Sequence, residues 1–454
     1  MGDYIVVISG AVINSNGFTS SDKMSKKDFL RANTGIQDPL FFDVSNNIFQ
    51  PGSWGRVNNH IQDRRDISAS VAGCFGSTST FRIPRVADLA GYIRLDVTLP
   101  ALASYSGGGY VAYQDWTAYA IIDRIDVSYA GNRLQTLYGE DIVEMIKMLA
   151  SEEELAAERA LAVGDEALGA RVLKSLAAQT VRGRLPLFFT VNPRFFLQVN
   201  AMSHELTIDI TWKSQALSVE TDHTTAGTAI TAFTAQSLEV TYIHQTPEDR
   251  AEQVAGTTTK TGYVFPFLDI ERQRYTSSST ADTSAVIQLA SLRGPTQYMY
   301  FTVRLSTDLA VTSGVPVRTF AYRSITDAGT ILFQANGSDV WSSMTQHELQ
   351  YDVHNRFWPQ VPVGELIYKL PFAWDPTSRT DASGSLNLGN LANPTLTITW
   401  PASFANLYLA PAASSGSGTT TAASTTTFSV VVDVKGLVHN TIQHRNGDVQ
   451  KNFA

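Results

Sequence analysis

The sequence predicts an all-β chain made of two consecutive β-sandwiches. Its 454 residues, 43% hydrophobic and only 17% charged, must bury a large core, and this length suits two or three domains or two large sandwiches. Apolar and polar residues alternate with a period of two in many short segments, which is typical of half-buried strands. Turns rich in Gly and Pro separate these segments. A disordered chain is excluded, because it would combine low hydrophobicity with high net charge.

The alternation is clearest in two segments of the first half. Residues 92–99 place Ile93, Leu95, Val97 and Leu99 on one face and polar residues on the other. Residues 206–213 repeat this pattern, with Trp212 as the last inward residue. Further strands are predicted at 237–242, 298–305, 395–400 and 428–434, with turns at 106–109, 130–132, 336–338 and 383–384. Many short strands between turns favour sandwiches or barrels.

One region, residues 139–178, breaks the β pattern. Apolar residues recur there at helical spacing, at Ile142, Met145, Ile146 and Leu149. Residues 151–154 (Ser-Glu-Glu-Glu) are typical of a capping box at the start of a further helix, for which Gly164 supplies the stop. A second short helix is expected through residues 173 and 176. The segment predicts a helical insertion within the first sandwich.

A shorter helix is predicted at residues 246–254, with Thr246 as its cap and Pro247 at the first helical position. It follows the strand at 237–242 near the middle of the chain, so we interpret it as the junction between the two β domains. Polar tracts at 221–234, 276–284 and 412–427 contain too few apolar residues to pack and are expected to be exposed loops.

Charge and cysteine content exclude several classes of protein. Residues 1–245 hold 20 Lys and Arg against 26 Asp and Glu, and the remainder holds 14 against 16, so neither half is basic enough for nucleic-acid binding by bulk electrostatics. Cys74 is the only cysteine, which excludes intrachain disulfides and Cys-rich zinc sites. No segment approaches the about 18 apolar residues that cross a bilayer. Residues 4–13 follow Asp3 rather than a basic segment, so a buried strand is preferred over a signal peptide.

No enzymatic or metal-binding pattern is found, and the chain is predicted to be neither an enzyme nor a cofactor binder. The eight histidines include no His-Glu-x-x-His motif. Ser203, His204 and Glu205 are adjacent on a strand and therefore cannot form a relay. Residues 106–109 lack the Lys that follows a phosphate-binding loop. The one usable N-glycosylation sequon begins at Asn336 and doubles as an Asn-Gly turn, so both readings stay open.

Several motifs, taken in order along the chain, resemble one family. They are residues 77–85 (Ser-Thr-Ser-Thr-Phe-Arg-Ile-Pro-Arg) with 88–91 before the strand at 92–99, residues 116–140 ending in Tyr-Gly-Glu, residues 185–189 (Leu-Pro-Leu-Phe-Phe) with 196–200, the crossing at 242–254, and residues 370–387 with Leu-Pro-Phe-Ala, Asp-Pro and Ser-Gly-Ser. In this order the chain resembles the double jelly-roll major capsid proteins of nucleocytoplasmic large DNA viruses and related smaller dsDNA viruses. The expected polar continuation after residue 387 and a Gly-rich ending are missing.

The resemblance implies two eight-stranded jelly rolls. It divides the chain into an N-terminal segment at the capsomer base (1–70), a first jelly roll (71–245) with the helical insertion at 139–178, a linker (246–262) and a second jelly roll (263–454). It implies a structural major capsid protein of the virion that forms homotrimeric, pseudo-hexagonal capsomers of an icosahedral shell assembled in the host cell, in the cytoplasm. Its partners would be copies of itself, neighbouring capsomers and minor capsid or penton proteins, without sequence-specific nucleic-acid contact. Loops at 101–115, 214–235 and 402–427 are expected to form the outer tower.

Two alternatives stay open at this stage. A carbohydrate-binding β-sandwich, like a lectin, could use Trp341, Trp358 and Trp374 to stack on sugars. A minor capsid protein could have the same fold. The sequence does not decide the host, the triangulation number or whether an internal membrane lies under the shell.

Overall fold

The computed structural model describes residues 60–452 except 104–109, 165, 191–195, 222–229, 246, 259–261, 278–281, 311–315, 326–328, 359–365, 379–382 and 402–428. The chain forms two compact units, one of Met1–Gln62 with Ile243–Gln253 and one of Asp63–Tyr242 with Val254–Ala454. Apart from residues 60–62 and 243–245, which end two strands of the first sandwich, both β-sandwiches lie in the second unit.

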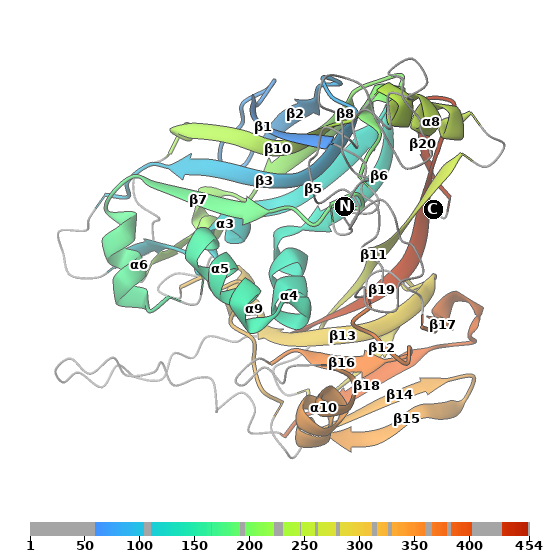
Figure 1. The fold of residues 1–454 in the computed structure, drawn as a ribbon. Helices are drawn as coiled ribbons and strands as arrows, with labels where there is room; N and C mark the ends of the chain where they lie inside the picture. Colours follow the sequence, from blue (N-terminus) through green and yellow to red (C-terminus); the bar gives the residue numbers. More distant parts are fainter. Residues whose placement is uncertain are drawn as a thin grey trace, which may run out of the picture. The chain divides into compact units, whose positions relative to one another are not determined.

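The first sandwich consists of two four-stranded sheets (Figure 1). One has the strand order β1-β10-β3-β7, and the other has the order β2-β8-β5-β6. Their strands are β1 (His60–Ser68), β2 (Thr78–Ile83), β3 (Leu89–Leu99), β5 (Ile122–Tyr129), β6 (Asn132–Tyr138), β7 (Gln179–Arg184), β8 (Leu206–Trp212) and β10 (Ala235–Gln245). The sheet therefore starts at His60, before the predicted domain boundary at residue 71.

The alternation found in the sequence determines which residues enter the first core. In β3 the apolar residues predicted to face inward are buried, while Arg94 and Asp96 are half-buried on the outer face. In β8 the inward set ends at Trp212, whose indole Nε1 donates to Ser79 Oγ at 2.6 Å. That hydrogen bond satisfies the polar atom of a fully buried ring.

The predicted helical insertion is present as three helices, α4 (Gly139–Leu149), α5 (Glu152–Ala162) and α6 (Leu168–Ser175). The capping box at Ser151 is confirmed, since its hydroxyl accepts from the Glu154 amide at 3.2 Å and the Glu154 carboxylate accepts from the Ser151 amide at 3.1 Å. Val163, rather than Gly164, adopts the left-handed conformation that ends α5. Gly164 instead makes room for the ring of Trp116, which an added Cβ would approach to 2.7 Å.

The second sandwich repeats the first strand by strand. Its sheets have the orders β11-β19-β13-β16 and β12-β18-β14-β15, in which each strand takes the place of its counterpart in the first sandwich. The strands are β11 (Tyr263–Thr276), β12 (Ser284–Gln288), β13 (Pro295–Leu305), β14 (Thr330–Ala335), β15 (Ser338–Thr345), β16 (Tyr368–Pro371), β18 (Thr395–Thr399) and β19 (Val430–Arg445), with β17 (Leu386–Asn387) and β20 (Asp448–Lys451) paired to β13 and β19. The prediction of two consecutive sandwiches is thus confirmed.

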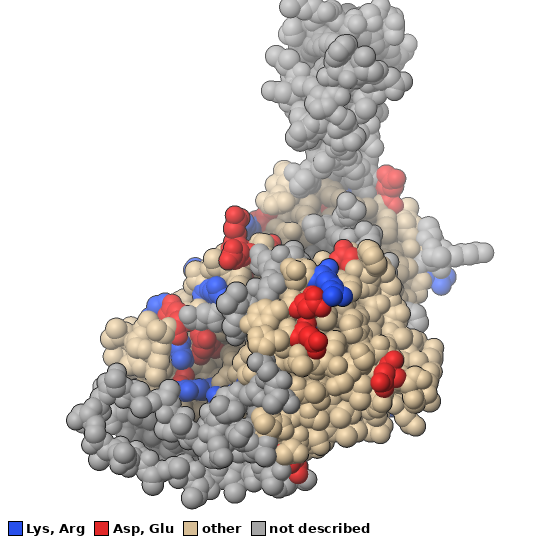
Figure 2. Space-filling model, turned by 90° about the horizontal axis from the view of Figure 1, so that it is seen from below, with Lys and Arg blue, Asp and Glu red and all other residues tan. Residues whose placement is uncertain are grey.

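The two sheets of the second sandwich differ on their outer faces. Of the residues in β12, β18, β14 and β15, Asp339 alone is charged. Figure 2 shows this side of the molecule as a largely uncharged surface with isolated charged side chains. The other sheet is buried on both faces along β13, because its inner face packs in the core and α4 covers its outer face. Met148 of α4 packs there with Tyr298, Tyr300 and Leu437.

Short elements complete the fold. The junction helix predicted at 246–254 is present as α8 (Pro247–Thr257). The other elements are α3 (Thr117–Ala120), η3 (Val199–Ala201), α7 (Gln215–Ser218), α9 (Ser306–Leu309), η4 (Glu348–Val353), α10 (His354–Phe357), η5 (Leu388–Asn390), β4 (Val111–Tyr113) and β9 (Val219–Thr221).

Two of the three loops predicted to form the outer tower contain short strands, and the tower itself stays a prediction. Within the loops predicted at 101–115 and 214–235, β4 and β9 pair as a two-stranded sheet, and all three residues of β4 are buried. Val111 and Tyr113 supply the apolar side chains that make this packing possible. The predicted loop at 402–427 lies outside the described residues.

Candidate functional site: a buried charge network

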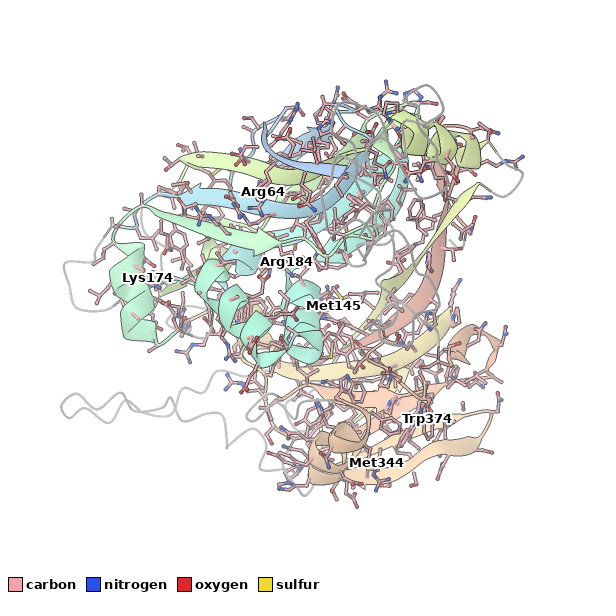
Figure 3. The ribbon with its side chains drawn as sticks, viewed as in Figure 1. Arg64, Met145, Lys174, Arg184, Met344 and Trp374 are labelled. Atoms are coloured by element: carbon pink, nitrogen blue, oxygen red, sulfur yellow. The ribbon has the colours of Figure 1, made fainter. Side chains whose placement is uncertain are left out.

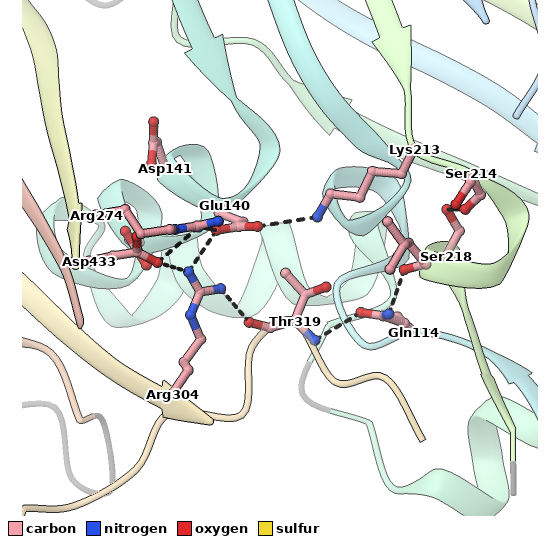
Figure 4. A network of polar contacts seen from close by, with 12 residues as sticks. Gln114, Glu140, Asp141, Lys213, Ser214, Ser218, Arg274, Arg304, Thr319 and Asp433 are labelled. Atoms are coloured by element: carbon pink, nitrogen blue, oxygen red, sulfur yellow. Dashed lines mark hydrogen bonds and ion pairs between the residues drawn. The ribbon is translucent and has the colours of Figure 1, made fainter. Parts of the chain in front are cut away.

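Nine charged side chains meet where α4 of the first sandwich covers the outer face of the sheet β11-β19-β13-β16. We call this set the charge network; it comprises Glu140, Asp141 and Glu144 of α4, Lys213 after β8, Arg272 and Arg274 of β11, Arg304 of β13, and Asp433 and Lys435 of β19. Figure 4 shows how α4 and these strands bring most of it together. Period-two alternation turns the strand residues outward, away from the core and toward the helix.

Arg304 is the centre of the network. Its guanidinium donates to Asp433 and, at 2.9 Å, to Glu140 Oε2, while Nη1 donates to the backbone carbonyl of Thr319 at 2.9 Å. The side chains of Arg304 and Asp433 are both 0% exposed. Asp433 also accepts from Arg274 at 2.5 and 3.0 Å. The planar, multidentate guanidinium suits such a buried site, where each donor needs an acceptor.

Lys435 forms the second centre. Its Nζ lies 2.6 Å from Asp141 Oδ1 and 2.5 Å from Glu144 Oε2, and all three side chains are almost fully buried. The hydroxyl of Tyr322 donates to the other oxygen of Glu144 at 3.0 Å. One cation of the second sandwich therefore holds two carboxylates of a helix that belongs to the first.

The network keeps its carboxylates in different electrostatic states. Burial by itself would raise the pKa of Glu140, but Arg304, Lys213 and Lys435 together hold that pKa well below its usual value. Burial would likewise raise the pKa of Asp433, but Arg304 and Arg274 outweigh burial, so this pKa is lowered. Burial raises the pKa of Glu144, with Lys435 opposing the shift and Asp141 reinforcing it. The pKa of Lys435 is raised despite burial, because its acidic neighbours stabilise the ammonium.

Local sequence places α4 where it can make these contacts. Gly139 opens the helix at a point where an added Cβ would lie 2.2 Å from the Tyr119 carbonyl oxygen and 2.7 Å from that of Ile122. Glu140 and Asp141 follow in the first turn, where the positive end of the helix dipole favours carboxylates. A glycine is thus needed for the close approach that carries the acidic turn against the sheet.

A second polar contact also joins the two sandwiches. Glu220 of β9 accepts from Arg171 of α6 at 2.9 Å and from Arg318, ahead of β14, at 2.7 Å. Close by, the Thr319 amide donates to Gln114 Oε1 at 3.1 Å. Thr319 links this contact to the charge network, because its carbonyl accepts from Arg304, so a continuous set of polar contacts joins the two sandwiches (Figure 4).

A cavity of about 110 Å³ lies beside the network, between α4, α5 and β11. Its lining is mostly apolar and includes Met145, Ile146, Phe188 and Phe267, with Glu158 and Arg184 on the lining as well. Figure 3 shows Met145 and Arg184 on either side of this region. Glu158 and Arg184 pair with each other at 3.4 Å, and the third charged residue of the lining, Glu154, accepts from the Ser151 amide in the capping box.

The chemistry of the network is structural. Each of its charged groups has an oppositely charged partner, and among the described residues no group of three or more His, Cys, Asp or Glu could hold a metal ion. No helix in the described part is long and apolar enough to cross a membrane. A buried network of opposite charges adds little net stability, but a misaligned one would leave charges without partners, so we interpret it as the device that sets the register between the sandwiches.

The residues singled out in the sequence lie elsewhere. Asn336 has the left-handed backbone of the β14–β15 turn, and its Oδ1 accepts from the Ala392 amide at 2.6 Å, which agrees with the predicted Asn-Gly turn. Glycosylation at Asn336 stays a prediction. Of the tryptophans required by the carbohydrate-binding alternative, Trp358 is buried and Trp341 packs against the second core, whereas Trp374 is 87% exposed (Figure 3).

Sequence reasoning missed the charge network, although one signal was available. Asp433 and Lys435 stand at alternate positions of an otherwise valine-rich strand, and such a strand is expected to be buried on both faces. Charges within it therefore imply buried partners.

Comparison with known proteins identifies the fold. Residues 52–245 match the family model of the major capsid protein N-terminus. No curated protein gives a significant match. Among solved structures, VP54 of PBCV-1, fitted into a reconstruction of the virophage Sputnik, is 20% identical with a TM-score of 0.65, covering 89% of this chain and 100% of its own. The Faustovirus major capsid protein is 10% identical with a TM-score of 0.63, covering 92% and 96%. A chain of the Sputnik virophage is 10% identical with a TM-score of 0.54, covering 90% and 91%.

These comparisons confirm the resemblance found in the sequence. The family model and the Faustovirus chain are both of major capsid proteins, which are structural proteins, and this agrees with the prediction that the chain is not an enzyme. The two sandwiches are accordingly called the first and second jelly roll below. Over residues 52–245 the chain matches the major capsid protein family, and its fold is that of the double jelly-roll major capsid proteins.

Proposed function

We propose that the chain is the major capsid protein of an icosahedral dsDNA virus, and that three copies form a pseudo-hexagonal capsomer. Its activity would be assembly, first into the trimer and then into the shell with neighbouring capsomers. Minor capsid or penton proteins would be its further partners, and the virion its location, after assembly in the cytoplasm of the host cell.

The observation that carries the proposal is the pair of matching jelly rolls joined within one compact unit. Both have the same strand order in both sheets, and the charge network fixes one against the other. Three such pairs around a threefold axis give six similar units, and a closed ring of six similar units has a nearly hexagonal outline. A chain whose jelly rolls moved independently could not form a tile of constant shape.

The low charge of the chain fits this role. The core of a protein–protein interface is depleted of charged residues, and only 17% of this chain is charged. Bulk nucleic-acid binding is not part of the proposal, because the formal net charge is -8.

The mass of the purified protein in solution tests the trimer. Light scattering after size exclusion should give about 150 kDa, three times the chain mass of 49.5 kDa. A strict monomer across the accessible concentration range would overturn the capsomer proposal. A minor capsid protein of the same fold is distinguished by its copy number in purified particles, which would be far below that of the main shell protein.

A further inference from the structure

We propose that, in the trimer, the helical segment Glu348–Phe357 (η4 and α10) of one copy packs on the outer face of the sheet β1-β10-β3-β7 in the next copy. The inference rests on the proposed trimer and names the two surfaces that would hold it together. It assigns each surface from the contact that the two jelly rolls already make within one chain.

The contact within the chain is the template. In the first jelly roll, α4 follows β6 directly and covers the outer face of the sheet β11-β19-β13-β16 of the second. In the second jelly roll, η4 and α10 follow β15, which is the counterpart of β6. The sheet β1-β10-β3-β7 is the counterpart of the covered sheet. In a ring of six similar units, each jelly roll meets one neighbour in its own chain and one in the next, so the same contact is expected to recur.

The receiving sheet has the composition of a covered face, but among the described residues no helix covers its outer face. On the outer face of β3, Tyr92 is followed at alternate positions by Arg94 and Asp96, as Tyr298 on β13 is followed by Tyr300 and Thr302. Tyr298 is fully buried against Met148 of α4 and the ring of Trp358, whereas Tyr92 is 43% exposed. A large aromatic side chain on the outer face of a strand becomes inaccessible to solvent only when another element packs over it, so an exposed Tyr92 suggests a surface that binds a partner.

The charges on the two sheets also correspond. On the middle strand β10, Glu239 accepts from Arg94 of β3 at 2.8 Å, as Asp433 of the middle strand β19 accepts from Arg304 of β13. Arg94 is 31% and Glu239 20% exposed, while both residues of the counterpart pair are 0% exposed. The first jelly roll thus carries a half-exposed version of the arrangement that α4 buries in the second.

The docking segment has one buried and one exposed side. Leu349, Val353 and His354 are buried in the second jelly roll. Tyr351 is 41% exposed, and the Asp352 side chain is 57% exposed with Arg356 as its pairing neighbour at 2.8 Å. Glu348 is exposed as well.

Charge complementarity favours a second copy as the occupant. The exposed side of the segment begins with two carboxylates four residues apart, at 348 and 352, as the α4 acids Glu140 and Glu144 are. The receiving sheet presents the half-exposed arginines Arg94 and Arg182, whose carboxylate partner Asp96 is shared between them. The charge network likewise pairs carboxylates of a helix with cations of a sheet, but on the receiving sheet Arg94 and Arg182 share their face with Asp96 and Glu239.

Two single substitutions test the contact from its two sides. Tyr351→Arg and Tyr92→Arg each place a bulky cation at the centre of one proposed surface, without touching a buried residue. Each is expected to raise the concentration at which half of the protein is monomeric by at least about tenfold in sedimentation velocity. Thr397→Arg, on the uncharged outer face of β18, is the matched control and should leave the trimer unchanged. Thermal melting of each variant shows that its fold is retained.

Crosslinking gives a second readout that does not depend on weakening the trimer. In a Cys74→Ser background, Tyr92→Cys and Tyr351→Cys are combined and treated with a short bismaleimide. Covalent trimers are expected from the double variant, while either single cysteine should give none.

The outcomes separate the two proposals. Trimers that dissociate on either tyrosine substitution and crosslink as covalent trimers support the inference. Wild-type protein that is trimeric, with both tyrosine variants equally trimeric and no covalent trimer, overturns the inference and leaves the proposed function standing. A wild-type monomer overturns both.

Discussion

Replacing Lys435 by Met removes the cation that the structure places between Asp141 and Glu144. Both carboxylates are buried, and Lys435 Nζ lies 2.6 and 2.5 Å from them. Met retains most of the volume of the Lys stem, so the change removes charge rather than packing. The variant isolates the part of the charge network that joins α4 to β19.

The size of the effect follows from protonation. A buried Glu144 that has lost its cation avoids carrying an unpaired charge by taking up a proton. Holding a carboxyl with a reference pKa of about 4.3 neutral at pH 7 costs about 1.4 kcal/mol for each of roughly 2.7 pH units, or about 3.7 kcal/mol. This agrees with the about 3–5 kcal/mol measured when one partner of a buried pair is removed. Spread over a chain of this length, at about 2.1 cal/mol/K per residue, it lowers Tm by about 3–5 °C.

Calorimetry across pH provides the assay. A carboxyl whose folded-state pKa is raised stabilises the fold at low pH and loses that contribution as pH rises, so the deficit of K435M should be largest at pH 7 and shrink toward pH 5. Adding Asp141→Asn and Glu144→Gln should recover most of the lost stability, because no unpaired charge is then left. A Tm change below about 1 °C, a deficit independent of pH, or no recovery in the triple variant would refute this reasoning.

Three further predictions concern single residues. Gly139→Ala should lower Tm by several degrees, because its Cβ would meet two backbone oxygens, whereas Gly169→Ala in α6, with nothing within 4 Å, should leave Tm unchanged or raise it slightly. Trp358→Ala should cost about 3–5 kcal/mol in urea unfolding, while Trp374→Ala should change the free energy of unfolding by less than about 0.5 kcal/mol, and equal losses would contradict their assigned burial. The pKa of Glu140 is held well below its usual 4.5, so the ionised carboxylate stabilises the fold above pH 4.5 and this stabilisation is lost as the pH falls below that value. The difference in unfolding free energy between wild type and Glu140→Gln should therefore shrink as the pH is lowered below 4.5. A difference that does not change with pH would exclude an ionic role for Glu140.

The fold could be predicted because its signals are local. Alternation at 92–99 and 206–213, the helical spacing from Ile142 to Leu149 and the capping box at Ser151 each depend on neighbours within a few residues. These elements were placed correctly, and they fix the class of fold. Strand pairing between residues more than 150 positions apart, such as Glu271 with Gly436, could not be predicted from such signals.

The charge network could not be predicted because it depends on tertiary packing. Glu140, Lys213 and Arg304 are far apart in the sequence, and each alone is compatible with a solvated surface position, while Asp433 signals a buried partner without indicating which residue it is. What places them together is the covering of one sandwich by a helix of the other. Internal strand-by-strand repetition is likewise visible only in the sheet orders, since the two halves differ in sequence.

Electron microscopy of the purified protein in negative stain tests the central claim most directly. If two matched jelly rolls, held rigidly by the charge network, form trimers, class averages should show particles of about 150 kDa with a nearly hexagonal outline, or plates and shells made of them. Single two-lobed particles at every concentration would contradict the account.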